Sequence, residues 1–231
     1  MSHRVRLFGS RVSPFVEKVA RALALKQMAF ELVEPRSPLD FARWNPQARK
    51  IPVLEVDGER FYDSTFILRQ LDLLVPSPPL RASAATTAAA QHLLEDWSDE
   101  ALYWYGMALR WTAKNAPATT AQIFASLPVP MRRLASLVAP RQIRATTLAQ
   151  GLGRLPPEVV LRELAGHLDS LVLILGAKPF FYAEQISVAD LAVYGQFHML
   201  RSGPTPDADA LFRARPALLE HMRRVEAATG R

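Results

Sequence analysis

The feature that most constrains the fold is a change of pattern near residue 75. Before it, short apolar runs alternate with stretches of helical periodicity. The segment "LVPSPPLRASAAT" (residues 74–86) then has three prolines, small polar residues and no apolar period, which is typical of a linker. Beyond it, only helical patterns follow, and nothing indicates paired strands. The sequence therefore predicts an α/β domain over residues 1–75, a linker over 76–86 and an all-helical domain over 87–231.

The first domain is predicted to have the element order β-α-β-α-β-β-α. "VRLF" and "FELV" have the pattern of short strands. Between them Pro14 suits the first position of a helix, where its missing N–H would be unpaired anyway. Val16, Val19 and Leu23 then repeat at helical spacing and predict one buried stripe. The polar stretch "SPLDFARWNPQARK" indicates a loop with a short helix.

A hairpin followed by a helix is predicted over residues 49–65, "RKIPVLEVDGERFYDST". Pro52 cannot donate a backbone hydrogen bond, so it belongs at the start of a strand or on an edge. The pair Asp57-Gly58 is a strong signal for a tight turn between two strands. Asp63 and Ser64 stand where a helix N-cap is expected, directly before "TFILRQLDLL".

The second domain is predicted to contain several helices. A long one should include Leu94, Trp97 and Tyr105 on one face, and others should cover "PVPMRRLASLV", "PPEVVLRELAGHLDSLVLILG" and "ISVADLAVYGQFHMLR". Ser187 and Asp190 have the S-x-x-D spacing of a capping box, in which each side chain satisfies a backbone N–H at the helix start.

The composition excludes several classes of function. With no cysteine, disulfides, thiolate metal sites and dithiol redox chemistry are impossible. The five histidines are scattered, so no metal site is expected, and no apolar run is long enough for a transmembrane segment. No signal-peptide pattern opens the chain, so we expect a cytoplasmic protein.

The net charge of +6 is mostly arginine and is densest over residues 131–154. No basic run is long or interleaved with aromatic residues, so a solvated helical face is the favoured interpretation. An anionic small substrate, a membrane surface and a nucleic acid remain as alternatives; we expect no nucleic-acid partner.

Three motifs in order carry a family resemblance: "VRLFGSRVSPFVEKVARAL", "NPQARKIPVLEVDGERFYDST" and "SVADLAVYG". Together with the linker they resemble a cytosolic glutathione transferase over nearly the whole chain. The first motif is similar to the serine-type, tau-like classes, and the second domain is also similar to metaxin-like and axon-connection-type relatives. The resemblance implies a thioredoxin-like α/β domain and an all-α domain. It also implies a homodimeric detoxification enzyme with glutathione as co-substrate and no metal.

The resemblance also implies a glutathione site. The Ile51-Pro52 bond should be cis, which turns the backbone of Ile51 toward the cysteinyl part of glutathione. Ser64 and the helix start should bind the γ-glutamyl carboxylate, and Asp63 should balance the ammonium. Lys50 and Arg36 match positions that contact the glycine carboxylate in tau-like members.

The implied catalytic residue is Ser13. A hydrogen-bond donor aimed at the glutathione sulfur favours the thiolate. Phe8 stands where the tyrosine classes have their hydroxyl, and no cysteine is present. Ser13 aligns with the serine of "SPF"-type members of the family, and Ser10 is the fallback. The electrophile is expected between the domains, beside four apolar residues: Phe15, Trp104, Met107 and Trp111.

The alternative function is a glutathione-transferase-fold binding or scaffold protein with little transferase activity. Such a protein would not need Ser13, Lys50, Ile51-Pro52 or the Asp63-Ser64 pair. Their presence favours the enzyme.

Overall fold

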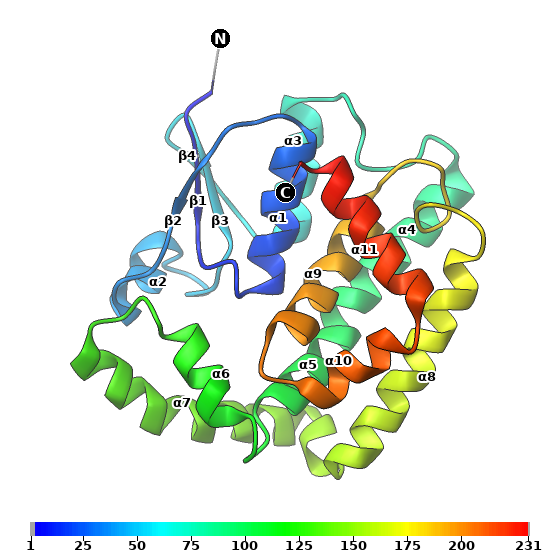
Figure 1. Cartoon of the computed structure of the whole chain (residues 1–231). Helices are drawn as coiled ribbons and strands as arrows, with labels where there is room; N and C mark the ends of the chain where they lie inside the picture. Colours follow the sequence, from blue (N-terminus) through cyan, green and yellow to red (C-terminus); the bar gives the residue numbers. More distant parts are fainter. Residues whose placement is uncertain (1–2, 231) are drawn as a thin grey trace.

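The computed structural model describes residues 3–230 and is shown in Figure 1. Its first part is a four-stranded sheet in the order β2-β1-β3-β4. β1 (Val5–Phe8) is parallel to β2 (Glu31–Val33) and antiparallel to β3 (Val53–Val56), which pairs with β4 (Glu59–Tyr62). The predicted order of elements and the hairpin are confirmed.

Three helices accompany the sheet: α1 (Pro14–Leu25), α2 (Pro38–Trp44) and α3 (Ser64–Leu74). Val16, Val19 and Leu23 of α1 are fully buried, as their spacing predicts. The Ile51-Pro52 bond is cis, as the resemblance implied, and Ser77-Pro78 is also cis, which the sequence did not indicate.

The rest of the described chain is helical. A first long helix was predicted as one piece, but it consists of α4 (Ala85–Trp97), a π-helical turn (Ser98–Leu102) and α5 (Tyr103–Arg110). Then follow α6 (Ala116–Ile123), α7 (Val129–Gln150), a 3₁₀ turn (Leu152–Arg154), α8 (Pro157–Leu175), α9 (Val188–Ser202), α10 (Pro206–Arg213) and α11 (Pro216–Ala228).

The domain boundaries at residues 75 and 87 stay a prediction. α3 ends at Leu74 and α4 begins at Ala85. Within residues 87–230 the sole strand-like pairing is an isolated bridge between Phe180 and Ala183, so this part of the chain has the helical character that the sequence predicts.

Helix α1 packs closely against α9, and a glycine makes this approach possible. A Cβ atom on Gly195 would lie 2.4 Å from the carbonyl oxygen of Pro14, well inside van der Waals contact. The absence of a side chain at Gly195 therefore lets α9 press against the first turn of α1. This contact holds the N-terminus of α1 at the junction of the two parts of the molecule.

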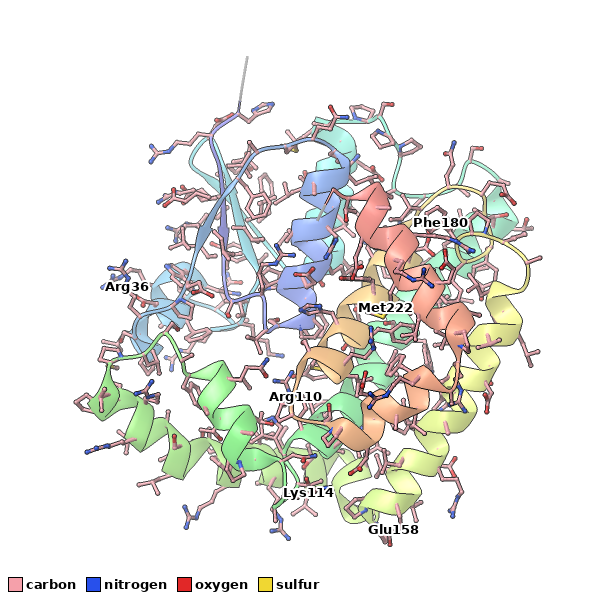
Figure 2. The ribbon with its side chains drawn as sticks, viewed as in Figure 1. Arg36, Arg110, Lys114, Glu158, Phe180 and Met222 are labelled. Carbon is pink, nitrogen blue, oxygen red and sulfur yellow. The ribbon has the colours of Figure 1, made fainter. Side chains whose placement is uncertain are left out.

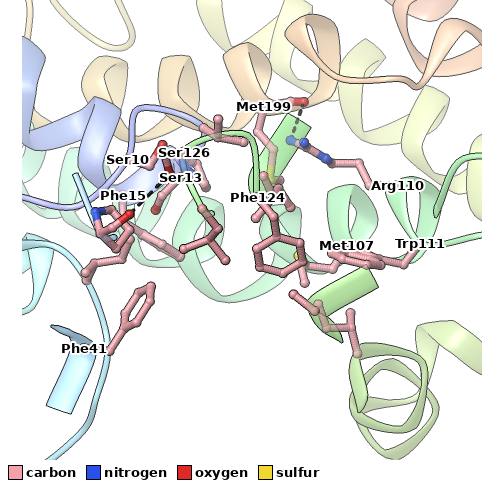
Figure 3. A pocket seen from close by; sticks show the side chains of 18 of the residues that line it. Ser10, Ser13, Phe15, Phe41, Met107, Arg110, Trp111, Phe124, Ser126 and Met199 are labelled. Atoms are coloured by element: carbon pink, nitrogen blue, oxygen red, sulfur yellow. Dashed lines mark hydrogen bonds between the residues drawn. The ribbon is translucent and has the colours of Figure 1, made fainter. Parts of the chain in front are cut away.

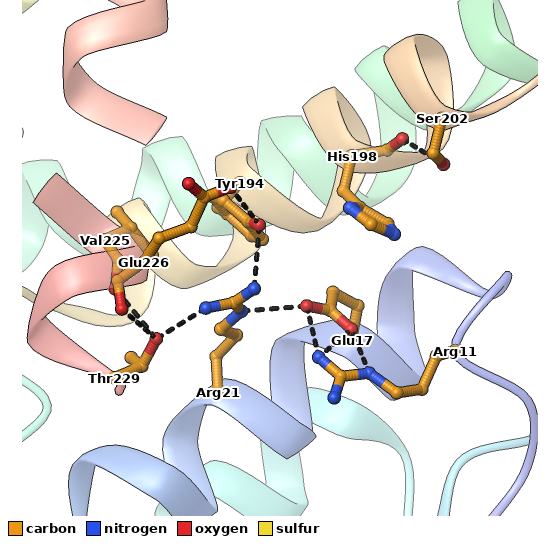
Figure 4. Close-up of polar contacts among 9 residues, drawn as sticks. All are labelled: Arg11, Glu17, Arg21, Tyr194, His198, Ser202, Val225, Glu226 and Thr229. Atoms are coloured by element: carbon orange, nitrogen blue, oxygen red, sulfur yellow. Dashed lines mark hydrogen bonds and ion pairs between the residues drawn. The ribbon is translucent and has the colours of Figure 1, made fainter. Parts of the chain in front are cut away.

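A buried polar network adds to this attachment (Figure 4). Arg21 of α1 donates to Tyr194 of α9 at 2.8 Å and to Thr229 beyond α11 at 2.7 Å. Glu17 accepts from Arg21 at 2.8 Å and from Arg11, in the loop before α1, at 2.6 Å. Because all of these groups except Arg11 are buried or nearly so, the network fixes α1 and its preceding loop to α9 and α11.

Candidate active site

Ser13 is the N-cap of α1, but its hydroxyl is not used as a cap. Its backbone N–H donates to the carbonyl of Ser10 at 2.9 Å, and Pro14 follows at the first helical position. The side chain makes no capping hydrogen bond, and no other described residue bonds to Oγ. The hydroxyl is therefore available to a ligand, beside the positive end of the α1 dipole.

Ser10 differs in this respect. Its Oγ donates to Oε1 of Glu34 at 3.2 Å, so this hydroxyl already has an acceptor. Both serines line the same cavity (Figure 3), yet only Ser13 combines a free hydroxyl with a helix N-terminus.

A polar cavity of about 440 Å³ brings most of the predicted glutathione residues together. Its wall includes Lys50, Ile51, Pro52, Asp63 and Ser64. Within residues 3–230, Lys50 forms no ion pair, and neither Ser64 Oγ nor the backbone N–H and C=O of Ile51 forms a hydrogen bond. This cavity thus presents a cation, a hydroxyl and an unpaired backbone edge, a set that fits a zwitterionic peptide such as glutathione.

Asp63 is the N-cap of α3, so Ser64 is the first residue of the helix. Oδ1 of Asp63 accepts from the backbone N–H groups of Thr65 at 3.0 Å and Phe66 at 3.4 Å. The backbone of Asp63 has a φ of +66°, in the left-handed region that residues other than glycine seldom adopt. Such conformations cluster at ligand sites, and Oδ2 remains free to meet a cation.

An apolar cavity of about 320 Å³ lies on the other side of Phe15 and Ile51, which line both spaces. Three of the four predicted electrophile residues line it, namely Phe15, Met107 and Trp111. Ser13 lines it too, two residues before Phe15, which the two cavities share.

Trp104 lines neither cavity, so the structure does not bring it together with Phe15, Met107 and Trp111. The wall of α5 is formed by Tyr103, Met107 and Trp111, which recur every four residues on one helical face. Trp104 is one position further around the helix and packs edge-on against Tyr103 at 5.2 Å. The ring of Tyr103 packs on that of Phe15, with the centroids 5.1 Å apart. The i, i+4 spacing of Tyr103 from Met107 was the sequence signal that could have identified Tyr103 as a cavity residue.

Arg36 is also separated from the predicted site. It lies beside α2 at the edge of the sheet (Figure 2) and lines a different hollow with Glu31 and Asp40. Its backbone N–H donates to Asp40 at 2.9 Å. The structure does not bring Arg36 together with Lys50.

The sequence did not indicate the acidic wall of the polar cavity. Asp99, in the π-helical turn, and the neighbouring Glu100 both line it. The ammonium of Lys18, which is buried, lies 2.6 Å from Asp99 and 2.8 Å from Glu95. Burial raises the pKa of Asp99, while Lys18 opposes the shift.

Arg110 is a further residue that the sequence analysis missed. Its buried guanidinium donates to the carbonyl of Met199 at 3.3 Å and to Gln122 at 2.6 Å. Burial lowers the pKa of Arg110 to about 10. Because Met199 lies in the last turn of α9, this cation stabilises the negative end of that helix while its side chain closes the apolar cavity.

No group of three or more possible metal ligands occurs within residues 3–230. The features that the structure brings together at this site are a serine hydroxyl, a helix N-terminus and two adjoining cavities, one polar and one apolar.

Comparison with known proteins identifies the family. The family models "Glutathione S-transferase, N-terminal domain" and "Glutathione S-transferase, C-terminal domain" match residues 7–79 and 155–230. The chain belongs to the glutathione S-transferase family, and its fold is the glutathione transferase fold.

Individual relatives agree with the tau-like resemblance. "Probable glutathione S-transferase GSTU1" of rice (Oryza sativa subsp. indica) is 36% identical over 122 residues, 48% of this chain and 52% of the relative. The chain thus spans about half the length of this curated relative.

Solved structures match over almost the whole chain. The tau-class enzyme MiGSTU from mango (Mangifera indica) has a TM-score of 0.63 at 24% identity, covering 97% of this chain and 89% of that one. A glutathione S-transferase from Methylobacterium radiotolerans, in complex with glutathione sulfonate, has a TM-score of 0.60 at 27% identity, covering 97% and 91%.

Proposed function

We propose that the protein is a glutathione S-transferase that activates the thiol of glutathione for attack on a hydrophobic electrophile. The observation that carries the proposal is the hydroxyl of Ser13. It has no partner among the described residues, stands at the N-terminus of α1 and lines the apolar cavity, which shares Phe15 and Ile51 with the polar one.

Glutathione would occupy the polar cavity. Its γ-glutamyl carboxylate would accept from Ser64 Oγ and the first N–H groups of α3, and Asp63 would face the ammonium. The backbone of Ile51 would pair with the cysteinyl residue, and Lys50 would bind the glycine carboxylate. Arg36 has no part in this arrangement, because it lines another hollow.

Ser13 would act on the sulfur. A free thiol has a pKa near 8.5, so only a small fraction is thiolate at neutral pH. Donation from Oγ and the dipole of α1 both favour the anion, and the thiol proton leaves to solvent. With an aryl halide in the apolar cavity, a sulfur–carbon bond forms while the carbon–halogen bond breaks, and halide departs with the electron pair.

We further propose a cytoplasmic homodimer with a role in detoxification. Among residues 3–230 no helix is both long and apolar enough to cross a membrane. Phe66 and Leu73 lie seven residues apart, on the same side of α3, and are 58% and 72% exposed; an exposed apolar stripe supports an interface.

The test has two stages. Calorimetric titration of the purified protein with glutathione should show saturable binding. A scaffold without a glutathione site would show none. Turnover of glutathione with a chloronitrobenzene-type electrophile should then proceed well above the uncatalysed rate. Binding without turnover would favour the scaffold alternative.

A further inference from the structure

The positive charge of the chain is concentrated in one segment. Between residues 101 and 157 there is no aspartate or glutamate, whereas seven lysines and arginines occur. This excess is larger than the net charge of the whole chain, +6. Neither family model matches residues 80–154, so the family patterns do not account for this segment.

Helix α7, in the second half of this segment, has two different faces. On one face Ala135 and Ile143 line the apolar cavity, and Thr147 is buried. On the other face Leu134 and Leu137 are 64% and 63% exposed, and Leu148 is also exposed. Figure 1 shows α7 along the outer edge of the molecule. Its outer leucines therefore have no covering element within the described chain.

Arginines stand among these leucines. Arg133, Arg141 and Arg144 are exposed, and their helical spacing from Leu134 and Leu137 places all five on the same side of α7. None of the three arginines forms an ion pair within residues 3–230. We call these five residues and Leu148 the outer face of α7.

We propose that the outer face of α7 binds the surface of a bilayer that contains anionic lipids. Leucines and arginines together on one exposed side suit the surface of such a bilayer, because the apolar side chains can enter the acyl boundary while the cations meet headgroup phosphates. Because residues 101–157 contain no aspartate or glutamate, no carboxylate of this segment would repel those phosphates.

Two other occupants fit the outer face less well. A nucleic acid would bind the arginines but would leave Leu134 and Leu137 against a hydrated polar groove. A second copy of the same face would set arginines against arginines, because the segment has no acidic residue to pair with them.

The inner face of the same helix adds a consequence. Because Ala135 and Ile143 line the apolar cavity, docking through the outer face would bring that cavity next to the acyl region. Apolar compounds dissolved in the membrane would then have a short path to the cavity.

Vesicle sedimentation with the full-length protein tests the proposal. The probe is a phosphatidylcholine vesicle with 0% or about 30% phosphatidylglycerol, at low and high salt. The wild type should bind the anionic vesicle and lose binding in salt. Replacing Arg133, Arg141 and Arg144 by glutamine should weaken binding by a factor on the order of 10², because each cation near an anionic surface strengthens it roughly fivefold.

Two controls are needed. One tests whether the position of the arginines matters as well as their charge, and the other tests whether the leucines of the outer face contribute. Replacing Arg162, Arg213 and Arg223 by glutamine removes the same net charge from exposed, acid-paired sites elsewhere and should change binding by less than about threefold. Leu134→Ser with Leu137→Ser should weaken vesicle binding while leaving capture by duplex DNA unchanged.

The proposal is overturned if the wild type binds neutral and anionic vesicles equally well, or if it binds neither kind of vesicle. It is also overturned if the two arginine triples behave alike. Equal binding of the leucine variant and the wild type to vesicles would show a general polyanion surface instead. Circular dichroism checks that each variant is folded.

Discussion

Replacing Asp190 by alanine tests how the helical part of the protein is held together. Oδ2 accepts from the backbone N–H and the hydroxyl of Ser187, both at 2.8 Å, which confirms the predicted capping box at the start of α9. Oδ1 accepts from the N–H of Phe181 at 2.8 Å and from Nε2 of His221 at 2.9 Å. The carboxylate and His221 are fully buried, so Asp190 connects α9, α11 and the loop between α8 and α9.

The magnitude follows from these bonds. Loss of an N-cap side chain costs about 1 kcal/mol. The N–H of Phe181 and Nε2 of His221 would in addition be left buried without an acceptor, at about 1–3 kcal/mol each. Water that enters the vacated space recovers part of the sum, so we expect Asp190→Ala to lower the free energy of unfolding by about 3–5 kcal/mol. For a chain of this length the melting temperature should fall by roughly 6–20 °C.

Urea unfolding and calorimetric melting measure the effect, with two comparison variants. Ser187→Ala removes only part of the cap and should cost about 1 kcal/mol. Asp207→Ala removes an exposed ion pair with Lys114 and should cost less than about 1 kcal/mol. The reasoning is refuted if Asp190→Ala costs no more than Ser187→Ala. Full stability with lost activity would mean that a catalytic residue has been taken for a structural one.

Two further predictions concern the polar cavity and the network behind it. Ser64→Ala should weaken glutathione binding about 10- to 100-fold, since a charge-assisted hydrogen bond contributes roughly 1.5–3 kcal/mol, and Asp63→Asn should keep the cap of α3 but also weaken binding. If calorimetry shows an unchanged affinity for glutathione in both variants, the assignment of the polar cavity as the glutathione site is wrong. Burial opposes ionisation of Glu17, but Arg11, then His198 and Arg21, outweigh it and hold its pKa below its ordinary value of 4.5. A group with a lowered pKa stabilises the fold above its unfolded-state pKa, and this stabilisation is lost as the pH falls through the folded-state pKa. The melting temperatures of wild type and Glu17→Gln should therefore differ at pH 7 and converge as the pH falls through the folded-state pKa of Glu17, which lies below 4.5; a constant difference would contradict this assignment.

Much of the α/β part could be predicted because its signals are local. The Asp57-Gly58 turn, the proline at the start of α1 and the spacing of Val16, Val19 and Leu23 each act within a few residues, and the structure follows them. The capping box of α9 is equally local. Residues 50–52 and 63–64 reach one cavity because the hairpin between them folds the chain back.

The rest depends on packing between distant segments. The prediction of one long helix missed the π-helical turn, because the helix propensities of residues 98–102 do not indicate it. The choice of Tyr103 over Trp104 depends on how α5 is rotated against Phe15, and the further wall of the apolar cavity comes from α6 and α7. Arg36 matched a family position in sequence, but the loop around it turns toward Asp40.

The pKa of bound glutathione tests the central claim most directly. Thiolate absorbance in the ultraviolet, followed against pH, should give a pKa for the wild-type complex well below the free value near 8.5. In Ser13→Ala the pKa should rise toward that value and the conjugation rate should fall about 10²–10³-fold, with glutathione affinity within a few-fold of wild type. Ser10→Ala, whose hydroxyl already bonds to Glu34, should change much less. A thiol pKa that is unaltered in Ser13→Ala, in an enzyme that remains active, would contradict the assignment of Ser13 as the group that stabilises the thiolate.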